Sequence, residues 1–213
     1  MYNDSAKLAE SLPLNDMLKE RMKRNFEQIV KSNGGEMFCT EKDMVEFYIH
    51  GTEILDFIKK KRAQYFSKRG YELIGIEVPL DYDLPNDIKF VGYIDIVIKD
   101  TVRDVIKIYD IKTSTMGWNK YQKADKNKTN QLLLYKQFFS KEKEIPIDKI
   151  DVEYLILKRK LYENIQYPQK RIQVFSPASG KPSVNKVLTR LQEFIDECYD
   201  DNGKIIANDY EKC

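Results

Sequence analysis

Residues 88–112 read IKFVGYIDIVIKDTVRDVIKIYDIK, and this stretch decides the fold. Its two halves are rich in Ile, Val and Tyr, a composition typical of β-strands, and Lys99-Asp100-Thr101 between them is typical of a turn. An earlier run with the same composition precedes a second turn at 83–87. We therefore predict a three-stranded antiparallel meander. Its strands are expected at 71–80, 88–98 and 104–112.

Apolar residues at helical spacing lie on both sides of this meander. We predict helices at 14–30, 41–68, 122–139 and 183–198, and further strands at 151–160 and 171–175. A helical connection is what a strand needs in order to return parallel beside an earlier one. The expected fold class is therefore α/β, with a mixed central β-sheet flanked by α-helices.

The length of 213 residues favours a single domain. We expect it to comprise a helical N-terminal part (1–70), a catalytic α/β core (71–160) and a C-terminal strand and helix (161–213).

Composition narrows the class of protein. The net charge is only +2, so any binding of nucleic acid has to come from local basic patches. No apolar run reaches the ~18–20 residues that cross a bilayer, and the N-terminal stretch lacks the apolar segment of a signal peptide. Three cysteines make a disulfide framework improbable. We expect a cytoplasmic protein of a bacterial or phage-infected cell without a membrane partner, since the abundance of Lys, Ile, Asn and Tyr suggests an AT-rich genome.

Three polar residues stand out within the apolar hairpin: Asp95 on one strand, and Asp110 and Lys112 on the next. Because side chains alternate along a strand, Asp110 and Lys112 share a face. Ile111 between them is expected to point into the core, with its carbonyl free near the carboxylates. Two carboxylates should not be buried together without a neutralising charge. A divalent cation, Mg²⁺ or Mn²⁺, would supply that charge through oxygen ligands.

This set of groups suits the hydrolysis of phosphodiester bonds. A metal lowers the pKa of a bound water and stabilises the charge that builds up on phosphate, and a nearby lysine orients that water or shares that charge. Asp95, Asp110 and Lys112 are therefore the candidate catalytic residues.

Three short motifs carry a family resemblance. Gly92-x-x-Asp95, Asp110-x-Lys112 and Gln131-x-x-x-Tyr135 resemble, in order, the core motifs of the PD-(D/E)XK nuclease superfamily. The last motif points to its RecB-like exonuclease branch, which includes CRISPR-associated and phage recombination exonucleases. The resemblance spans roughly residues 50–135 and implies a restriction-endonuclease-like sandwich.

The resemblance also implies residue roles. It makes His50, Asp95, Asp110 and the Ile111 carbonyl the metal ligands, and Lys112 the catalytic lysine. Gln131 and Tyr135 would lie one helical turn apart and face the site. Gln131 would hold Lys112 or a phosphate oxygen, and Tyr135 would contact the DNA backbone.

The chain departs from many RecB-like nucleases in its cysteines. Those proteins carry an iron–sulfur cluster on four cysteines, whereas this chain has only Cys39, Cys198 and Cys213 and no C-x-x-C. An iron–sulfur cluster is not expected in this chain.

Some residues keep more than one interpretation. The segment with Trp118, Lys120 and Tyr121 mixes aromatic rings with positive charge, which suits stacking on a single strand, although a solvated loop is the alternative. Glu77 is either a further ligand, a contact to Lys112, or an ordinary strand-edge carboxylate. The basic run 59–62 fits a nucleic-acid contact and a solvated helix face equally well.

The sequence predicts a Mg²⁺- or Mn²⁺-dependent deoxyribonuclease, an exonuclease that acts on single-stranded ends in DNA recombination or repair. Its expected partner is DNA, with a homo-oligomer or a recombination protein as further options. Two alternatives stay open. One is an RNA endonuclease of the cap-snatching type, and the other is a catalytically inactive nucleic-acid-binding protein.

Overall fold

The computed structural model describes residues 11–67 and 69–206. Its helices and strands, in chain order, are α2 (Leu14–Ser32), α3 (Glu41–Lys61), η1 (Arg62–Gln64), β1 (Tyr71–Asp83), β2 (Lys89–Asp100), β3 (Val105–Ser114), α4 (Lys120–Ala124), α5 (Lys126–Glu142), η2 (Ile147–Lys149), β4 (Ile150–Lys158), β5 (Ile172–Phe175) and α6 (Lys181–Cys198).

The strands form one five-stranded sheet in the order β1-β2-β3-β4-β5. β1 pairs with β2 and β2 with β3 in antiparallel fashion, so the predicted meander is confirmed. Beyond the ends of β3 and β4, the amides of Arg159 and Lys160 donate to the carbonyls of Ser114 and Thr115 in turn, a progression typical of chains running parallel. The α/β class, with a mixed sheet and flanking helices, is confirmed.

The chain divides into two compact units, each assembled from separate segments. The first unit contains 1–69, 113–117 and 156–173, and the second contains 70–112, 118–155 and 174–213.

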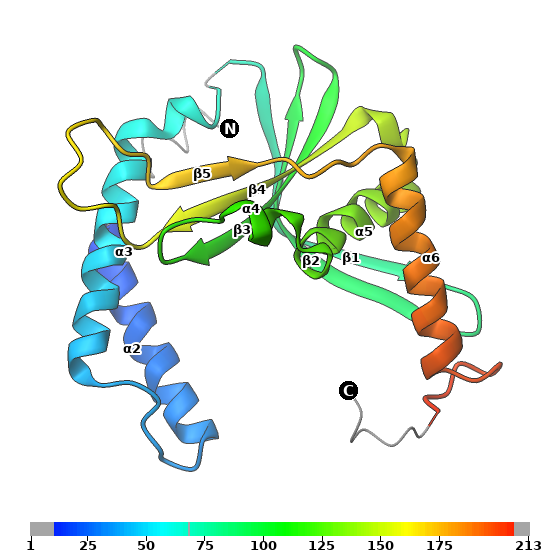
Figure 1. Ribbon diagram of the computed structural model, residues 1–213, viewed down its shortest axis with the longest axis horizontal. Coiled ribbons are helices and arrows are strands. Elements are labelled where there is room, and N and C mark those ends of the chain that lie inside the picture. Colours follow the sequence, from blue (N-terminus) through cyan, green and yellow to red (C-terminus); the bar gives the residue numbers. More distant parts are fainter. Residues whose placement is uncertain (1–10, 68, 207–213) are drawn as a thin grey trace. The chain divides into compact units, whose positions relative to one another are not determined.

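The second unit holds the antiparallel meander and most of the buried core. Ile94, Ile108 and Leu132 have no exposed surface. Helix α5 packs against β1, and α6 packs against α5 (Figure 1). The rings of Phe90 on β2 and Phe138 on α5 stack with their centroids 4.4 Å apart, which ties the helix to the sheet.

The first unit contains a pair of helices, α2 and α3, that lie side by side (Figure 1). α3 begins with a capping box, in which the Thr40 side chain accepts from the Asp43 amide and the Asp43 carboxylate accepts from the Thr40 amide. α2 buries no residue completely and α3 buries only Ile54. This pair therefore contributes little to the core.

Two predicted helices end differently in the structure. The second helix stops at Lys61 and continues as the short 3₁₀ turn η1, rather than reaching residue 68. The predicted helix 122–139 is two helices, because Asp125 has extended backbone angles and its carboxylate accepts from the Asn127 amide as the N-cap of α5. In the ranges that the structure describes, no helix is long and apolar enough to span a membrane.

Candidate active site

The site lies where the pairing of β2 with β3 ends. The last paired residues are Ile96 and Tyr109, and the same register brings Asp95 opposite Asp110 one step further. At this point a side chain, and not the backbone, joins the two strands. Oδ2 of Asp95 accepts a hydrogen bond from the Ile111 amide at 2.6 Å. Asp95 is thereby held against the strand that carries the other two candidate catalytic residues.

Asp110 is a carboxylate buried in the fold, with only 3% of its surface exposed. Lys112 Nζ lies 2.8 Å from its Oδ2 and forms an ion pair with it. Apart from Lys112, that oxygen has no polar partner among the described residues. Burial raises the pKa of Asp110 above its usual value, the pairing with Lys112 opposes this, and the negative charge of Asp95 adds to it.

Lys112 connects this buried carboxylate to the helix that covers the sheet. Its Nζ donates to Gln131 Oε1 at 3.0 Å, and Gln131 Nε2 donates to the Tyr135 hydroxyl at 2.9 Å. A lysine only donates, which fixes the orientation of the Gln131 amide. The Lys112 side chain is 34% exposed, so its amine reaches both the buried network and the solvent.

The glycine of the first motif is explained by the tyrosine of the third. A Cβ at position 92 would lie 2.9 Å from Cε1 of the Tyr135 ring, closer than side chains tolerate. Only glycine lets the Tyr135 ring approach β2 this closely. All three motifs therefore meet in one cluster within the second unit.

Two expectations for this cluster are corrected. Ile111 does not point into the core, because 38% of its surface is exposed and the strand places Asp110 inside instead. Tyr135 is buried and its hydroxyl accepts from Gln131, so it holds the network in place rather than lying open to a DNA backbone.

Glu77 has an unusual backbone conformation for a residue within a strand. Its φ is +48°, a left-handed value that costs a non-glycine residue on the order of 1–3 kcal/mol. The pairs Ile76–Ile96 and Val78–Ile94 on either side place it opposite Asp95 in register. Strain of this kind concentrates at functional sites, and the sequence, which singled out the carboxylate, gave no sign of the strained backbone.

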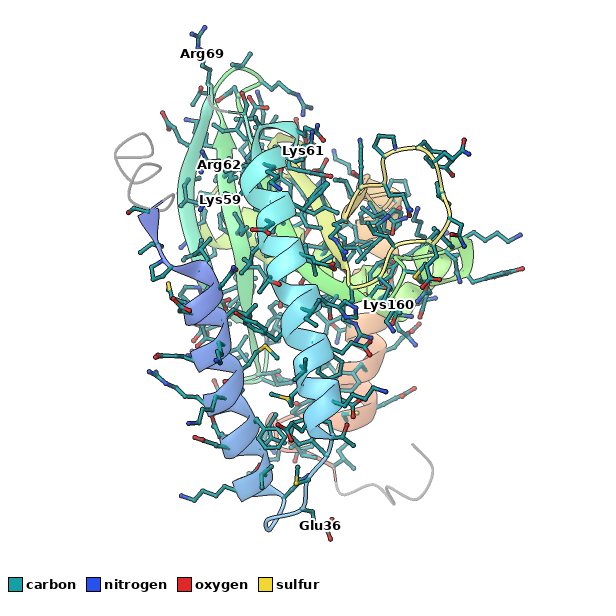
Figure 2. The ribbon with its side chains drawn as sticks, turned by 90° about the vertical axis from the view of Figure 1, so that its left-hand side faces the viewer. Glu36, Lys59, Lys61, Arg62, Arg69 and Lys160 are labelled. Carbon is teal, nitrogen blue, oxygen red and sulfur yellow. The ribbon has the colours of Figure 1, made fainter. Side chains whose placement is uncertain are left out.

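His50 belongs to the first unit, on α3. Its Nδ1 is buried without a hydrogen-bond partner among the described residues, and lies 3.9 Å from Oε1 of Glu46. Glu46 is itself paired at 2.8 Å with Lys160, which lies beside α3 (Figure 2). The metal-ligand role of His50 stays a prediction.

The carboxylate oxygens of the cluster are of the kind that Mg²⁺ and Mn²⁺ prefer as ligands. In residues 11–67 and 69–206, no group of three or more His, Cys, Asp or Glu side chains is arranged to hold a metal ion. Asp95 and Asp110 lie opposite each other in register, and the buried Oδ2 of Asp110 is paired only with Lys112 among the described residues. Mg²⁺ is often held by one or two carboxylates together with waters and substrate phosphates. The residues present therefore fit a site completed by substrate, and do not form a cage made wholly of protein ligands.

The aromatic segment after β3 divides into a buried part and an exposed part. Trp118 is buried and its ring lies 5.0 Å from the ring of Tyr154 and 6.1 Å from that of Phe175. The expectation that Trp118 stacks on nucleic-acid bases is therefore wrong, because its ring faces are used in the core. Tyr121 is 74% exposed, with Lys120 Nζ 5.0 Å from its ring centroid, so these two remain available for such a contact.

Tyr154 is a neighbour of the site that the sequence did not reveal. Burial raises the pKa of its hydroxyl, and the charge of Asp110 adds to that shift. The hydroxyl donates to the Lys128 carbonyl. Among the apolar residues of β4 nothing distinguishes this tyrosine from an ordinary core residue, so no sequence signal could have found it.

For part of the basic run at the end of α3, the structure favours a solvated helix face. Figure 2 shows Lys59, Lys61 and Arg62 along the C-terminal end of the helix, with Arg69 beyond it. Lys59 lines a cavity that also contains the carboxylates of Asp16 and Asp56. These nearby acids weaken the case for Lys59 as a contact to nucleic acid.

Cysteine chemistry adds no site in the described residues. Cys39 and Cys198 are free thiols that lie in different units. Cys213 lies outside the described residues. The expected absence of an iron–sulfur cluster stays a prediction.

The chain was also compared with known proteins. It matches no protein-family model, and no curated protein matches it. Among solved structures it is similar to a candidate exonuclease from Eubacterium rectale, with 14% sequence identity and a TM-score of 0.45. The match covers 84% of this chain, which spans 62% of the length of that one. Similarity at this level carries no argument about activity.

Proposed function

We propose that the chain is a metal-dependent nuclease that hydrolyses phosphodiester bonds. The observation that carries the proposal is the linked set formed by Asp95, Asp110 and Lys112, with Asp110 buried and its Oδ2 paired only with Lys112 among the described residues. A buried carboxylate that is costly to ionise is the kind of group found at catalytic sites. The surrounding network holds it in place without neutralising it fully.

Each residue of the cluster has its own proposed role in the reaction. Asp95 and Asp110 would hold a divalent cation, and the Ile111 amide fixes the orientation of Asp95. Lys112 would donate to a phosphate oxygen or to the attacking water from its exposed side, while Gln131 restrains its amine. Tyr135 positions Gln131 from behind. When bound, Mg²⁺ or Mn²⁺ would supply the charge that activates water and stabilises the phosphate in the transition state.

The reaction adds water across the phosphodiester. A P–O bond forms to the water oxygen, the P–O bond to one sugar oxygen breaks, and that oxygen leaves with a proton. Lys112 is the only cationic group described in contact with Asp110, so we assign it the role of sharing the negative charge that builds up on the phosphate.

The finer proposal concerns the substrate and follows the motif resemblance. Single-stranded DNA ends, processed in recombination or repair, are the proposed substrate. The Ile111 carbonyl is a further proposed metal ligand. Lys120 and Tyr121, both exposed, are the proposed contacts to the strand.

The test uses an end-labelled linear single-stranded DNA and a closed circle of the same sequence. Each is incubated with the protein in Mg²⁺, Mn²⁺ or EDTA, beside Asp110→Ala and Lys112→Ala variants. We expect the linear strand to be degraded only with metal and only by the wild type. A spared circle identifies an exonuclease, and a cut circle an endonuclease.

Two outcomes would contradict this proposal. Folded wild-type protein that cuts neither DNA in any metal contradicts a deoxyribonuclease. Matched RNA strands then separate an RNA endonuclease from a protein that only binds nucleic acid. Equal cleavage by Lys112→Ala and the wild type would instead place the reaction elsewhere in the chain.

A further inference from the structure

A second candidate site lies in the same unit, on a different side of α5 from the carboxylates. It is a cavity of about 370 Å³ between the first turns of α5, the first half of α6 and the segment after β5. Its floor is firm, because Leu133 and Val187 belong to the buried cluster that joins the two helices. The residues that line it are Lys123, Lys126, Thr129, Asn130, Leu133, Phe175, Pro177, Ala178, Ser183, Lys186, Val187 and Arg190.

The charge of this cavity is entirely positive. Four lysine or arginine side chains line it and no acidic residue does. Lys186 and Arg190 are four residues apart on α6, where like charges repel each other and lower helix stability. Neither has an ion-pair partner in the described part of the chain. The arrangement therefore lacks an anion that would balance it.

The nearest acid is already engaged. Asp125 lines the adjoining cavity together with Lys126 and Arg190, but its carboxylate is paired with Lys128 at 3.1 Å and caps α5 through the Asn127 amide. Those two contacts hold the pKa of Asp125 below its usual value. Asp125 is therefore committed to the start of its helix.

A buried amide adds a polar group to the wall. Oδ1 of Asn130, which only accepts hydrogen bonds, is buried without a partner among the described residues, so it suits a donor on the organic part of a ligand and not the phosphate itself. Lys123 Nζ lies 5.7 Å from the centroid of the Phe175 ring, so its charge stays at the edge of the apolar floor. A rigid apolar floor with cations along its rim suits a compact anion that has an organic part.

We propose that this cavity binds a phosphate group of a single-stranded nucleic acid, at a point on the strand away from the bond that is cut. The inference rests on the proposed function. Asn130 in the cavity wall and Gln131 in the catalytic network are consecutive residues of α5, so one rigid helix carries both sites. A strand held in the cavity would be anchored to the element that positions Lys112.

The test measures binding without cleavage. Fluorescence anisotropy follows a labelled single-stranded oligonucleotide in EDTA at several salt concentrations, for the wild type and for Lys186→Ala/Arg190→Ala. The matched control is Lys19→Ala/Arg21→Ala, which removes the same charge from exposed positions on α2. A second variant, Lys186→Arg/Arg190→Lys, keeps the charge. Thermal melts check that all variants are folded.

We expect the double alanine variant to bind about tenfold more weakly at low salt. Each lost phosphate contact lowers the slope of log K against log salt by roughly 0.7, so two contacts lower it by about 1.4. The α2 control and the charge-keeping variant should bind like the wild type. A wild-type slope in the double alanine variant overturns the proposal, as does a wild type that binds no oligonucleotide.

Competition experiments identify the source of the phosphate. Inorganic phosphate, a mononucleotide and hexaglutamate compete with the oligonucleotide at equal charge concentration. Weak competition by all three supports a phosphate of the strand. Competition by mononucleotide or inorganic phosphate as strong as by unlabelled oligonucleotide overturns it in favour of a small-ligand site, and strong competition by hexaglutamate overturns it in favour of an acidic peptide. Because EDTA removes cleavage, these results are independent of whether the chain is a nuclease.

Discussion

The ring of Tyr135 on α5 lies so close to Gly92 on β2 that a Cβ on residue 92 would meet its Cε1 at 2.9 Å and its hydroxyl at 3.3 Å. The hydroxyl in turn accepts from Gln131, and Gln131 accepts from Lys112. Through these contacts Gly92, which has no side chain, sets the position of the Lys112 amine beside Asp110. Gly92 is part of the site because the absence of a side chain leaves room for the Tyr135 ring.

Gly92→Ala should therefore displace the Tyr135 ring. We expect the free energy of unfolding to fall by about 1–3 kcal/mol, as when an extra methyl is forced into a packed core. Cleavage should fall with it. Chemical denaturation of Gly92→Ala, Tyr135→Ala and the double variant measures the coupling. Strictly additive losses would contradict the contact.

Asp110→Asn should stabilise the folded protein at neutral pH in EDTA. The pKa of Asp110 is raised on folding, so the folded state holds a proton that the unfolded state releases above the ordinary pKa of 3.8. The free energy of unfolding therefore falls as pH rises through the raised pKa, and the ionised carboxylate is a cost at pH 7. Its removal should raise the free energy of unfolding by on the order of 1 kcal/mol.

Urea unfolding at pH 7 and at a pH well below 3.8 measures this effect. The difference between wild type and variant should vanish at the lower pH, where Asp110 is protonated in both states. A wild type that is the more stable of the two at pH 7 would mean that the Lys112 ion pair outweighs the cost of burial.

Gln131→Ala should slow the reaction while leaving strand binding nearly unchanged. It removes the acceptor that restrains Lys112 and the donor to Tyr135, and partners of this kind typically contribute 10–100-fold to activity. Steady-state cleavage in Mn²⁺ separates kcat from KM. Tyr135→Phe, which keeps the ring and the Gln131–Lys112 bond, should lose less. An effect confined to KM would make Gln131 a substrate contact instead.

Trp118 and Tyr121 should respond in opposite ways. Trp118→Ala removes a buried ring and should lower the free energy of unfolding by about 3–5 kcal/mol. Tyr121→Ala at an exposed position should leave stability within about 0.5 kcal/mol and weaken single-strand binding by roughly 1–3 kcal/mol. Thermal melts and anisotropy give the two values. Weaker binding without loss of stability in Trp118→Ala would restore its role as a base contact.

Much of the architecture follows from local patterns in the sequence. The meander is predictable because Ile- and Val-rich runs are separated by clear turns, and its three strands differ from prediction by only a few residues. The end of α3 and the break at Asp125 cannot be predicted in this way, since each depends on which polar group caps a helix. Helical periodicity continues across both points, so it carries no information about the break.

The candidate site was predictable in its members but only partly in its geometry. Spacing along two strands placed Asp95, Asp110 and Lys112 together, and the described hydrogen bonds and ion pair connect them. Alternation along the strand also predicted a buried Ile111, which is wrong because the face of β3 that buries Tyr109 is exposed from Ile111 onward, while Asp110 on the other face stays buried. The strained backbone of Glu77 and the burial of Trp118 depend on packing, which spacing does not contain.

The most direct test of the account is the rate at which the protein degrades an end-labelled single-stranded DNA in Mn²⁺. Wild type is measured beside Asp110→Asn and beside Asp201→Asn, which removes the same charge from an exposed position. We predict metal-dependent cleavage by wild type and Asp201→Asn, none in EDTA, and a loss of at least a hundredfold in Asp110→Asn, by analogy with the removal of one transition-state contact. Cleavage by Asp110→Asn at the wild-type rate would contradict the assignment of this site.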